Sequence, residues 1–390
     1  MSETILEQNL IETARELNDA AFDLNLYLAD HPEISGEEYN SVEYITNMLE
    51  DYGINCEKGI LNIPTAFKGE VSRSDTSDIN IAIITEYDAL PGIGHACGHC
   101  ASCAISILSA LSLKKCFKDY DANIDIIGTP DEENIGMKIP MADSGFFDKY
   151  DLAIMIHMST QSIVNWKFLA FETYDFTFKG KASHASAAPW DGRNAEDGML
   201  LMFHAFDMMR QRLKDGSRIE GIILESGKAS NIIPDRAKCR YTFRAKEISY
   251  LRESVLPMVF DAAKGAAMAT QTEVEFERFG FPFLDMKILP SGEKVLTDIF
   301  SKYGIEKDEI TDALGSSDMG NVSYRCPSFH PSISVSDHNI PLHTVEFEAA
   351  MRTENTKNAI LKGAIVILAM IAKVIEDEDF RMELRREFEA

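Results

Sequence analysis

Three short apolar runs, rich in isoleucine, restrict the fold of this chain more than any other feature. They cover residues 79–84, 124–128 and 152–157, and helical segments separate them. Such an alternation predicts an α/β sheet whose active-site loops follow the strand ends. Side chains that suit metal binding or acid–base chemistry occur after each run or at its end: Asp88, Cys97, His99, Glu132, Glu133 and His157. Core packing does not explain this coincidence, so we expect one site at this edge of the sheet.

The segment Gly94–His99 places a thiol and an imidazole two residues apart in a glycine-rich turn. Cys and neutral His are preferred ligands of zinc and similar metals. The glycines let the backbone bend, so that neighbouring side chains can converge on one ion. A second segment, Thr129–Glu133, follows the next predicted strand and ends in two adjacent carboxylates. A metal ion with a spare carboxylate is sufficient to activate water at neutral pH, so the sequence predicts a hydrolase.

Composition limits the class of protein. With 390 residues, 45% of them hydrophobic, the chain is long enough for two domains with large cores. A formal net charge of −25 disfavours nucleic acid as a partner, because its phosphates would be repelled. The first residues lack the features of a signal peptide, and we expect no membrane span. Seven unevenly spaced cysteines are typical of free thiols in a reducing compartment, so we expect a cytoplasmic protein.

Cys97, Cys100 and Cys103 have a spacing that an iron–sulfur site could also use. The alternative is that Cys100 and Cys103 lie at the start of a helix, where small apolar thiols pack well. A bacterial-type cluster would also need a fourth Cys followed by Pro, whereas Cys116 precedes Phe117. An iron–sulfur or redox protein is therefore the weaker hypothesis.

The middle of the chain has a different pattern. We expect strands at residues 168–178, 219–224, 239–243 and 273–279, and helices at 194–213 and 250–268. The order β-α-β-β-α-β is typical of a ferredoxin-like α+β domain. The predicted architecture is therefore a mixed-sheet catalytic domain with flanking helices, formed by residues 1–166 and 285–390, and an inserted lid or dimerisation domain at residues 167–284.

These and further segments resemble metallopeptidase family 20, which includes aminoacylases, auxin-conjugate hydrolases, carboxypeptidases and small dipeptidases. The similarity is closest to its amidohydrolase and dipeptidase-like branch. The matching segments follow one another along nearly the whole chain: Tyr87–Pro91, Gly94–His99, Gly128–Glu133, Gly180–Ala185, Ala187–Trp190, Asn231–Pro234, Gly315–Gly320 and Leu342–Thr344. The resemblance implies a metal-dependent hydrolase that cleaves the amide bond of a small N-acyl amino acid or a dipeptide.

The resemblance also implies two divalent metal ions per subunit (Zn, Mn, Co or Ni), bridged by the Cys97 thiolate. His99, Glu133, His157 and His343 would complete the ligand set. Glu132, next to a ligand but not itself one, would carry the proton from water to the leaving amine.

The residues alone leave alternatives open for several of these side chains. Instead of binding a metal, His157 could be a hydrogen-bonded polar residue on a strand, and His343 could be a solvated residue of a loop. His95 and His338 are competing ligands, although His95 also suits a role in orienting a ligand. Asp88 suits the same role, holding either a ligand histidine or a loop amide.

By the same resemblance, His184 in the inserted domain would reach the site of a partner subunit in a homodimer and help to bind the tetrahedral oxyanion. Asn231 would contribute to the substrate pocket, and Arg244 would pair with a substrate carboxylate or lie on the surface. Cys100 stands where relatives commonly have Asn or Asp, so metal preference or substrate fit could differ. A catalytically silent binding protein on the same fold is the last alternative, and an intact Glu132 argues against it.

Overall fold

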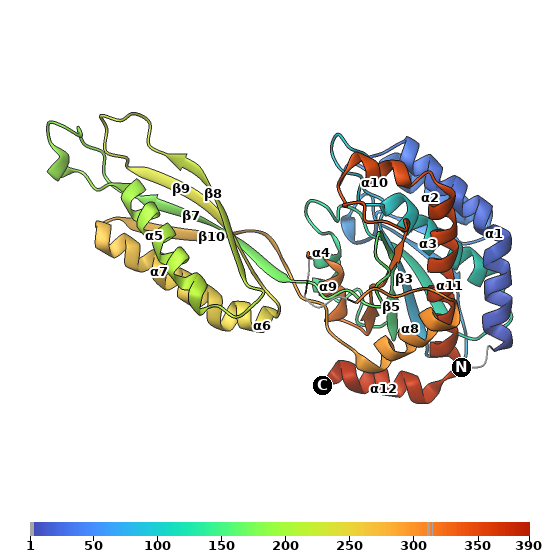
Figure 1. Ribbon diagram of the computed structural model, residues 1–390. Helices are drawn as coiled ribbons and strands as arrows, with labels where there is room; N and C mark the ends of the chain where they lie inside the picture. Colours follow the sequence, from blue (N-terminus) through green and yellow to red (C-terminus); the bar gives the residue numbers. More distant parts are fainter. Residues whose placement is uncertain (1–3, 310–312, 314) are drawn as a thin grey trace. The chain divides into compact units, whose positions relative to one another are not determined.

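The computed structural model describes residues 4–309, 313 and 315–390, which form two compact units. Of the described residues, the first unit comprises 4–166, 286–309 and 317–390. The second comprises 167–285, 313, 315 and 316. Figure 1 shows both units, with many of their helices and strands labelled.

A mixed six-stranded sheet, with strand order β1-β2-β4-β3-β5-β11, forms the centre of the first unit. β4, β3, β5 and β11 are parallel, whereas β1 and β2 pair antiparallel at one edge. The three predicted runs are therefore neighbours in the sheet, and their carboxyl ends lie along one edge. The strands are β1 (Asn55–Lys58), β2 (Phe67–Ser72), β3 (Asn80–Thr85), β4 (Asn123–Gly128), β5 (Leu152–Ile154) and β11 (Ser328–Phe329).

The third predicted run is shorter as a strand than we expected. β5 ends at Ile154, and the chain continues as β6 (His157–Ser159) in a separate two-stranded sheet. β6 pairs in parallel with β12 (Ser332–Ser334), and His157 lies opposite Ser332. His157 therefore begins a strand rather than ending one.

Helix α3 (His99–Lys115) is the central helix of this unit, because every residue from His99 to Leu113 is buried. It packs against α1 (Ile5–Asp30) and α11 (Glu354–Glu376), and the apolar side chains of the three helices share one core with those of the sheet. A helix buried on all sides must satisfy its polar groups internally. Ser106 does so by donating its hydroxyl to the carbonyl oxygen of Ile84, 2.8 Å away.

The remaining helices of the unit are shorter or peripheral. They are α2 (Tyr39–Asp51), the 3₁₀ turn η1 (Ile60–Asn62), α4 (Lys138–Asp143), α8 (Pro290–Lys302), α9 (Met319–Ser323), α10 (Val345–Ala350) and α12 (Glu378–Glu389).

Helix α11 is long and apolar enough to cross a membrane by length and composition alone, with a mean hydropathy of 2.0 over its best 18-residue window. The structure buries 72% of that window inside the unit, as is common for the core helix of a globular domain. Lys362 and Lys373 interrupt the apolar run in the sequence, so the uninterrupted apolar stretch is shorter than the roughly 18–20 residues of a membrane span.

The second unit is a four-stranded antiparallel sheet with strand order β10-β7-β9-β8. Two helices, α5 and α7, pack on it and bury a separate apolar core. The elements follow the predicted order: β7 (Ala170–Lys179), α5 (Ala195–Met209), β8 (Arg218–Ser226), β9 (Arg236–Ala245), α7 (Leu256–Thr270) and β10 (Glu273–Phe283).

Both helices of this unit are shorter than the sequence pattern indicates. The predicted helix at 194–213 begins after Asn194, whose side chain accepts a hydrogen bond from the Glu196 amide, and ends at Met209 before a 3₁₀ turn (η3, Arg210–Arg212). The helix predicted at 250–268 is divided in the structure. A short α6 (Ile248–Tyr250) and a π-helical turn (η4, Leu251–Val255) come first, and α7 begins only at Leu256. A further 3₁₀ turn, η2 (Pro189–Asp191), precedes α5.

The close packing of α11 on α3 depends on Gly363, where an added Cβ would lie 2.5 Å from Cδ1 of Ile105. We expect Gly363→Val to lower the free energy of unfolding by about 1–3 kcal/mol, the usual cost of overpacking a core. Gly265→Val is the matched control, because this helical glycine has no atom within 4 Å of the added Cβ. Chemical denaturation measures both. Equal stability of the two variants would contradict this account of the helix contact.

Candidate metal centre

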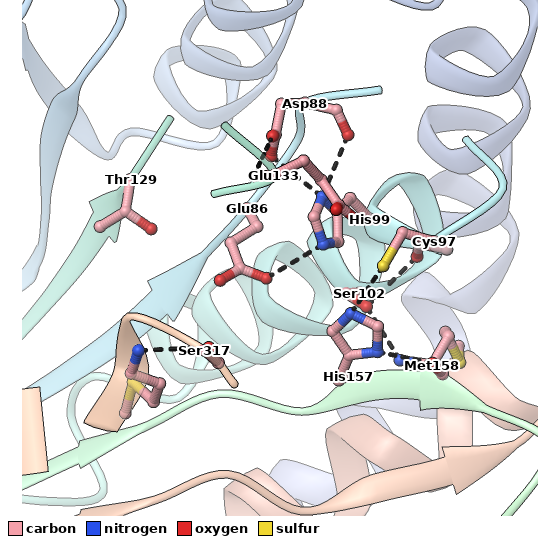
Figure 2. Close-up of polar contacts among 12 residues, drawn as sticks. Glu86, Asp88, Cys97, His99, Ser102, Thr129, Glu133, His157, Met158 and Ser317 are labelled. Atoms are coloured by element: carbon pink, nitrogen blue, oxygen red, sulfur yellow. Dashed lines mark hydrogen bonds and ion pairs between the residues drawn. The ribbon is translucent and has the colours of Figure 1, made fainter. Parts of the chain in front are cut away.

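The sequence-predicted site residues divide between the two units. His184, Asn231 and Arg244 belong to the second unit. The others belong to the first unit: Asp88, His95, Cys97, His99, Glu132, Glu133, His157 and His343. Figure 2 shows several of them converging where β3 and β4 end and β6 begins.

Among the described residues, four groups of side chains in the first unit could each hold a metal ion. Two of them contain Cys97, and a third combines His99, Glu132 and Glu133. In one of the two with Cys97, the ligand atoms of Cys97, His99 and His157 all lie within 4.8 Å of one another. In the other, the same holds for Cys97, Glu133 and His343. Cys97 Sγ lies 3.4 Å from Nε2 of His157, and His343 Nε2 lies 3.4 Å from Oε1 of Glu133. Cys97, the side chain that the resemblance implies as the bridging ligand, is thus the one member that these two groups share.

Asp88 orients two members of these groups. Its Oδ1 lies 2.9 Å from Nδ1 of His99, and its Oδ2 accepts hydrogen bonds from the Glu133 amide and the Ser35 hydroxyl at 3.0 and 2.8 Å. Burial alone raises the pKa of Asp88, but His99 and the two donors outweigh burial and hold the pKa well below its usual range. An ionised Asp88 requires His99 to donate through Nδ1, so in the neutral ring Nε2 carries the lone pair for a ligand. Burial lowers the pKa of His99, but Cys97 and Asp88 outweigh burial and raise it well above its usual value, so the ring must give up its Nε2 proton to bind a metal ion.

A hydrogen bond also fixes the tautomer of the His157 ring. Its Nδ1 lies 2.6 Å from the carbonyl oxygen of Met158, so Nδ1 carries the proton and Nε2 faces Cys97. Burial lowers the pKa of His157, which keeps the ring neutral. A neutral imidazole with one nitrogen tied to a carbonyl is the form that binds metals.

Several buried polar atoms of the site lack hydrogen-bond partners, as expected of atoms that bind a cation. His99 Nε2 and Glu86 Oε2 lie 3.4 Å apart, and among the described residues neither has a hydrogen-bond partner. Burial raises the pKa of the Cys97 thiol well above its usual value, so a thiolate here needs nearby positive charge. Unsatisfied buried atoms are costly, and a divalent ion would satisfy them.

The adjacent carboxylates of Glu132 and Glu133 have opposite protonation behaviour. For Glu133, burial raises the pKa, but hydrogen bonding from His343 and the proximity of His99 reverse this and bring it to about 2. For Glu132, burial next to the carboxylates of Glu86 and Asp318 raises the pKa well above its usual range. Neighbouring carboxyl groups with separated pKa values are typical of an acid–base site.

Two residues of the site have left-handed backbone conformations that non-glycine residues rarely adopt. Asp131 has φ of 60° and turns the chain just before Glu132, and its amide donates to Oε1 of Glu38 at 2.9 Å. His343 has φ of 63°, and its amide donates to the carbonyl oxygen of Ala96 at 2.9 Å. Such strain is commonly retained where it positions functional side chains.

The competing ligand candidates from the sequence lie outside the groups that could hold a metal ion. His95 is fully buried, burial lowers its pKa to about 3, and no hydrogen bond joins its ring to a ligand side chain among the described residues. His338 is exposed and pairs with Asp337. Cys100 and Cys103 are buried on α3, where burial raises both thiol pKa values to about 12. Neither cysteine belongs to a ligand group of the described residues, which disfavours an iron–sulfur site.

Sequence reasoning missed three charged residues that adjoin the site: Glu86, Lys138 and Asp318. Glu86 and Asp318 form a further group of converging carboxylates with Glu132. Both stand next to or inside segments that carry the family resemblance, Tyr87–Pro91 and Gly315–Gly320, so the motifs could have indicated them. No sequence signal distinguishes Lys138 from a surface lysine.

In the second unit, His184 and Asn231 lie on neighbouring segments, because the amide of Ala185 donates to the carbonyl oxygen of Asn231 at 2.9 Å. His184 is exposed, and its Nδ1 accepts from the amide of Ala187 at 3.2 Å, which leaves Nε2 as the outer nitrogen. Arg244 donates to Ser316 at 2.9 Å and pairs with Glu220 at 3.3 Å. A substrate carboxylate would therefore compete with Glu220 for this guanidinium.

Comparison with known proteins gives matches to both units. A family model described as "Peptidase dimerisation domain" matches residues 171–264. The chain is 28% identical to the mouse protein named "Xaa-Arg dipeptidase", covering 98% of this chain and 92% of the mouse protein. It is 29% identical to one component of the p-aminobenzoyl-glutamate hydrolase of Escherichia coli, covering 70% of this chain and 60% of that protein.

Solved structures share the fold. A protein of methicillin-resistant Staphylococcus aureus superposes with a TM-score of 0.81 at 18% identity, covering 95% of this chain and all (100%) of that one. A Bacillus subtilis protein described as a "Dinuclear Metal Binding Peptidase from M20 Family" superposes with a TM-score of 0.69, also at 18% identity, covering 91% of this chain and 99% of that one.

Glu38 gives a test of the hydrogen bonds that hold the turn before Glu132. It is fully buried, its Oε1 accepts from the amides of Gly36 and Asp131, and burial raises its pKa from 4.5 to about 7. Between these two values the folded state keeps a proton that the unfolded chain has released. Stability should therefore fall as the pH rises from 4.5 to 7, by no more than about 3 kcal/mol.

Glu38→Gln keeps an acceptor for both amides and should remove this part of the pH dependence. Denaturant unfolding at several pH values measures it, and Glu37→Gln, at the exposed neighbouring position, is the control. If Glu38→Gln has the same pH slope as the wild type, Glu38 does not titrate in this range.

Proposed function

Because this chain belongs to the M20 family of peptidases, we propose that it is a metal-dependent amidohydrolase that cleaves the amide bond of a small N-acyl amino acid or a dipeptide. The main support is the convergence of Cys97, His99, His157, Glu133 and His343 into two ligand groups that share one thiol, with the Glu132 carboxylate beside His99 and Glu133. Relatives named as a dipeptidase, as p-aminobenzoyl-glutamate hydrolase and as carboxypeptidases support the bond type.

Two divalent ions per subunit, Zn, Mn, Co or Ni, are proposed as cofactors. Cys97, His99 and His157 would hold one, and Cys97, Glu133 and His343 the other. When bound, such ions lower the pKa of water towards 7 and polarise a carbonyl oxygen. Asp88 holds His99 and the Glu133 amide in place, so that both groups are preorganised.

Glu132 is the proposed proton carrier. Its carboxylate takes a proton from the water whose oxygen attacks the amide carbon, and later delivers this proton to the nitrogen as the C–N bond breaks. The products are a carboxylate and an amine. The raised pKa of Glu132 suits this role, because a group that must both accept and donate a proton works best with a pKa near the operating pH.

The exposed edge of the second unit supports a homodimer. Strand β8 is the edge strand of its sheet and exposes Ile222, Ile223 and Leu224 to 60%, 50% and 43%. An edge strand with exposed apolar side chains readily pairs with another strand. A second copy of this chain is the proposed occupant, in keeping with the dimerisation family model over residues 171–264. A cytoplasmic location is also proposed, and the seven free cysteines support it.

The roles of the two adjacent glutamates are separable. Glu132→Gln should keep its metal content and lose about 10²–10⁴-fold in kcat, because general base catalysis contributes that much. Glu133→Gln should instead bind less metal. The measurements are metal content by mass spectrometry and amine release from N-acyl amino acids and dipeptides, with activity abolished by chelator and restored by Zn, Mn or Co. Full activity in metal-free protein would contradict the proposal, as would equal metal loss in both variants.

His184 tests the shared site. His184→Ala should bind metal normally and lose about 10²–10³-fold in kcat, the usual effect of removing one oxyanion donor. Mixing His184→Ala with Glu132→Gln should restore activity, because one site in each mixed dimer then has both residues. The control carries Ile223→Lys in both chains, which places a charge on the β8 edge and should abolish both the dimer and the rescue. Mixed dimers that have exchanged subunits and remain inactive would disprove the shared site.

A further inference from the structure

A further group of carboxylates lies beside the two ligand groups that contain Cys97. Glu86 follows β3, Glu132 lies in the turn after β4, and Asp318 precedes α9. One oxygen atom of each carboxylate lies within 4.8 Å of the other two, as the ligands of one cation would. Carboxylate oxygens are the ligands preferred by Mg²⁺, Ca²⁺ and Mn²⁺. Without a positive charge to neutralise it, this group of carboxylates would compete with the neighbouring ligands for divalent ions.

The ammonium of Lys138 already lies in this group. Nζ donates to Oδ1 of Asp318 at 2.7 Å and also to Oε1 of Glu86, while the backbone amide of Lys138 donates to Oδ2 of Asp318 at 3.0 Å. The Lys138 and Asp318 side chains are fully buried, and Glu86 is 1% exposed. Burial alone lowers the pKa of Lys138, but the carboxylates of Asp318 and Glu86 more than compensate and raise it above its usual value. The lysine is therefore a permanent cation.

We propose that Lys138 is a positioning residue whose ammonium occupies this carboxylate group in place of a divalent ion, and so prevents Glu132 from joining Glu86 and Asp318 as a ligand of an ion held there. Lys138 uses Glu86 and Asp318 as its partners. No hydrogen bond or ion pair to the Glu132 carboxylate occurs among the described residues. Glu132 is therefore the member of the group that remains available.

A divalent ion in the same place would have the Glu132 carboxylate within reach as a third ligand, because one oxygen atom of each of the three carboxylates lies within 4.8 Å of the others. A carboxylate bound to such an ion could no longer accept a proton. Lys138 thus gives a physical reason why Glu132 and Glu133, adjacent in sequence, have different roles. This consequence for catalysis rests on the proposed function, whereas the occupancy of the carboxylate group does not.

The competing explanation is that Lys138 only joins α4 to α9 through a buried ion pair. Removing the Lys138 ammonium distinguishes this explanation from the proposal. Lys138→Met has a side chain of similar length without charge, so the carboxylates of Glu86, Glu132 and Asp318 are free to bind an ion. A purely structural ion pair predicts lower stability and no change in the number of bound ions.

The experiment uses the full chain, stripped with chelator and dialysed against MnCl₂, with bound manganese counted per chain. Lys138→Met should bind one ion more than the wild type, and Lys138→Met/Asp318→Asn should bind the wild-type number, because one carboxylate ligand is gone. Lys149→Met is the matched control. Lys149 also pairs with a buried aspartate, Asp125, but belongs to no ligand group of the described residues. It should bind the wild-type number.

A folded Lys138→Met that binds only the wild-type number of ions would overturn the proposal. If Lys138→Met does not fold, Asp318→Asn decides, because the ammonium then loses one partner and is free to pair with Glu132. The expected result is a kcat lower by at least about tenfold, with KM and metal content unchanged. An unchanged kcat overturns the proposal. If no substrate is hydrolysed by any variant, the proposed function fails, but the manganese counts still test Lys138.

Discussion

Asp88 is buried just beyond the end of β3, and the geometry of the whole site depends on its two carboxylate oxygens. One fixes the ring of His99 at the start of α3, and the other holds the amide of Glu133 in the turn after β4. The same carboxylate also binds Ser35, so three separate segments meet at one ionised group. Because β3 and β4 are parallel neighbours, their carboxyl ends bring these segments within hydrogen-bond reach. The large apolar core around α3 supports this arrangement.

Negative charge is the main physical cost of the site. Asp88, Glu86, Glu132, Glu133 and Asp318 lie close together in surroundings that are largely excluded from water. The Asp88 carboxylate is stabilised by hydrogen bonds from the His99 ring, the Glu133 amide and the Ser35 hydroxyl, and Glu86 and Asp318 pair with the Lys138 ammonium. The Glu132 and Glu133 carboxylates and the Cys97 thiol remain, and these are the groups that divalent ions would neutralise. Acid–base chemistry and metal binding thus arise from one charge distribution.

Much of this arrangement could be predicted from the sequence. Apolar runs, their separation by helices and the residue types that follow them indicate an α/β unit with a metal site at its strand ends. The β-α-β-β-α-β order of the second unit also follows from its periodicity. The pattern did not predict that β5 ends at Ile154, because the next two residues, Met155 and Ile156, are as buried and apolar as the strand itself. The π-helical turn before α7 was missed for a similar reason, since a π turn leaves the hydrophobic pattern of a helix almost unchanged.

The sequence by itself determined which side chains are available for chemistry and where they follow strands, because ligand type and strand periodicity are local properties. Only the tertiary structure decided which of them meet. His343 joins Glu133 while His95 and His338 stay apart, and Lys138 pairs with Asp318 across 180 residues of sequence. Such contacts depend on how distant segments pack, and burial then sets the charge of each group. A lysine on a short helix becomes an internal cation only because folding surrounds it with carboxylates and excludes water.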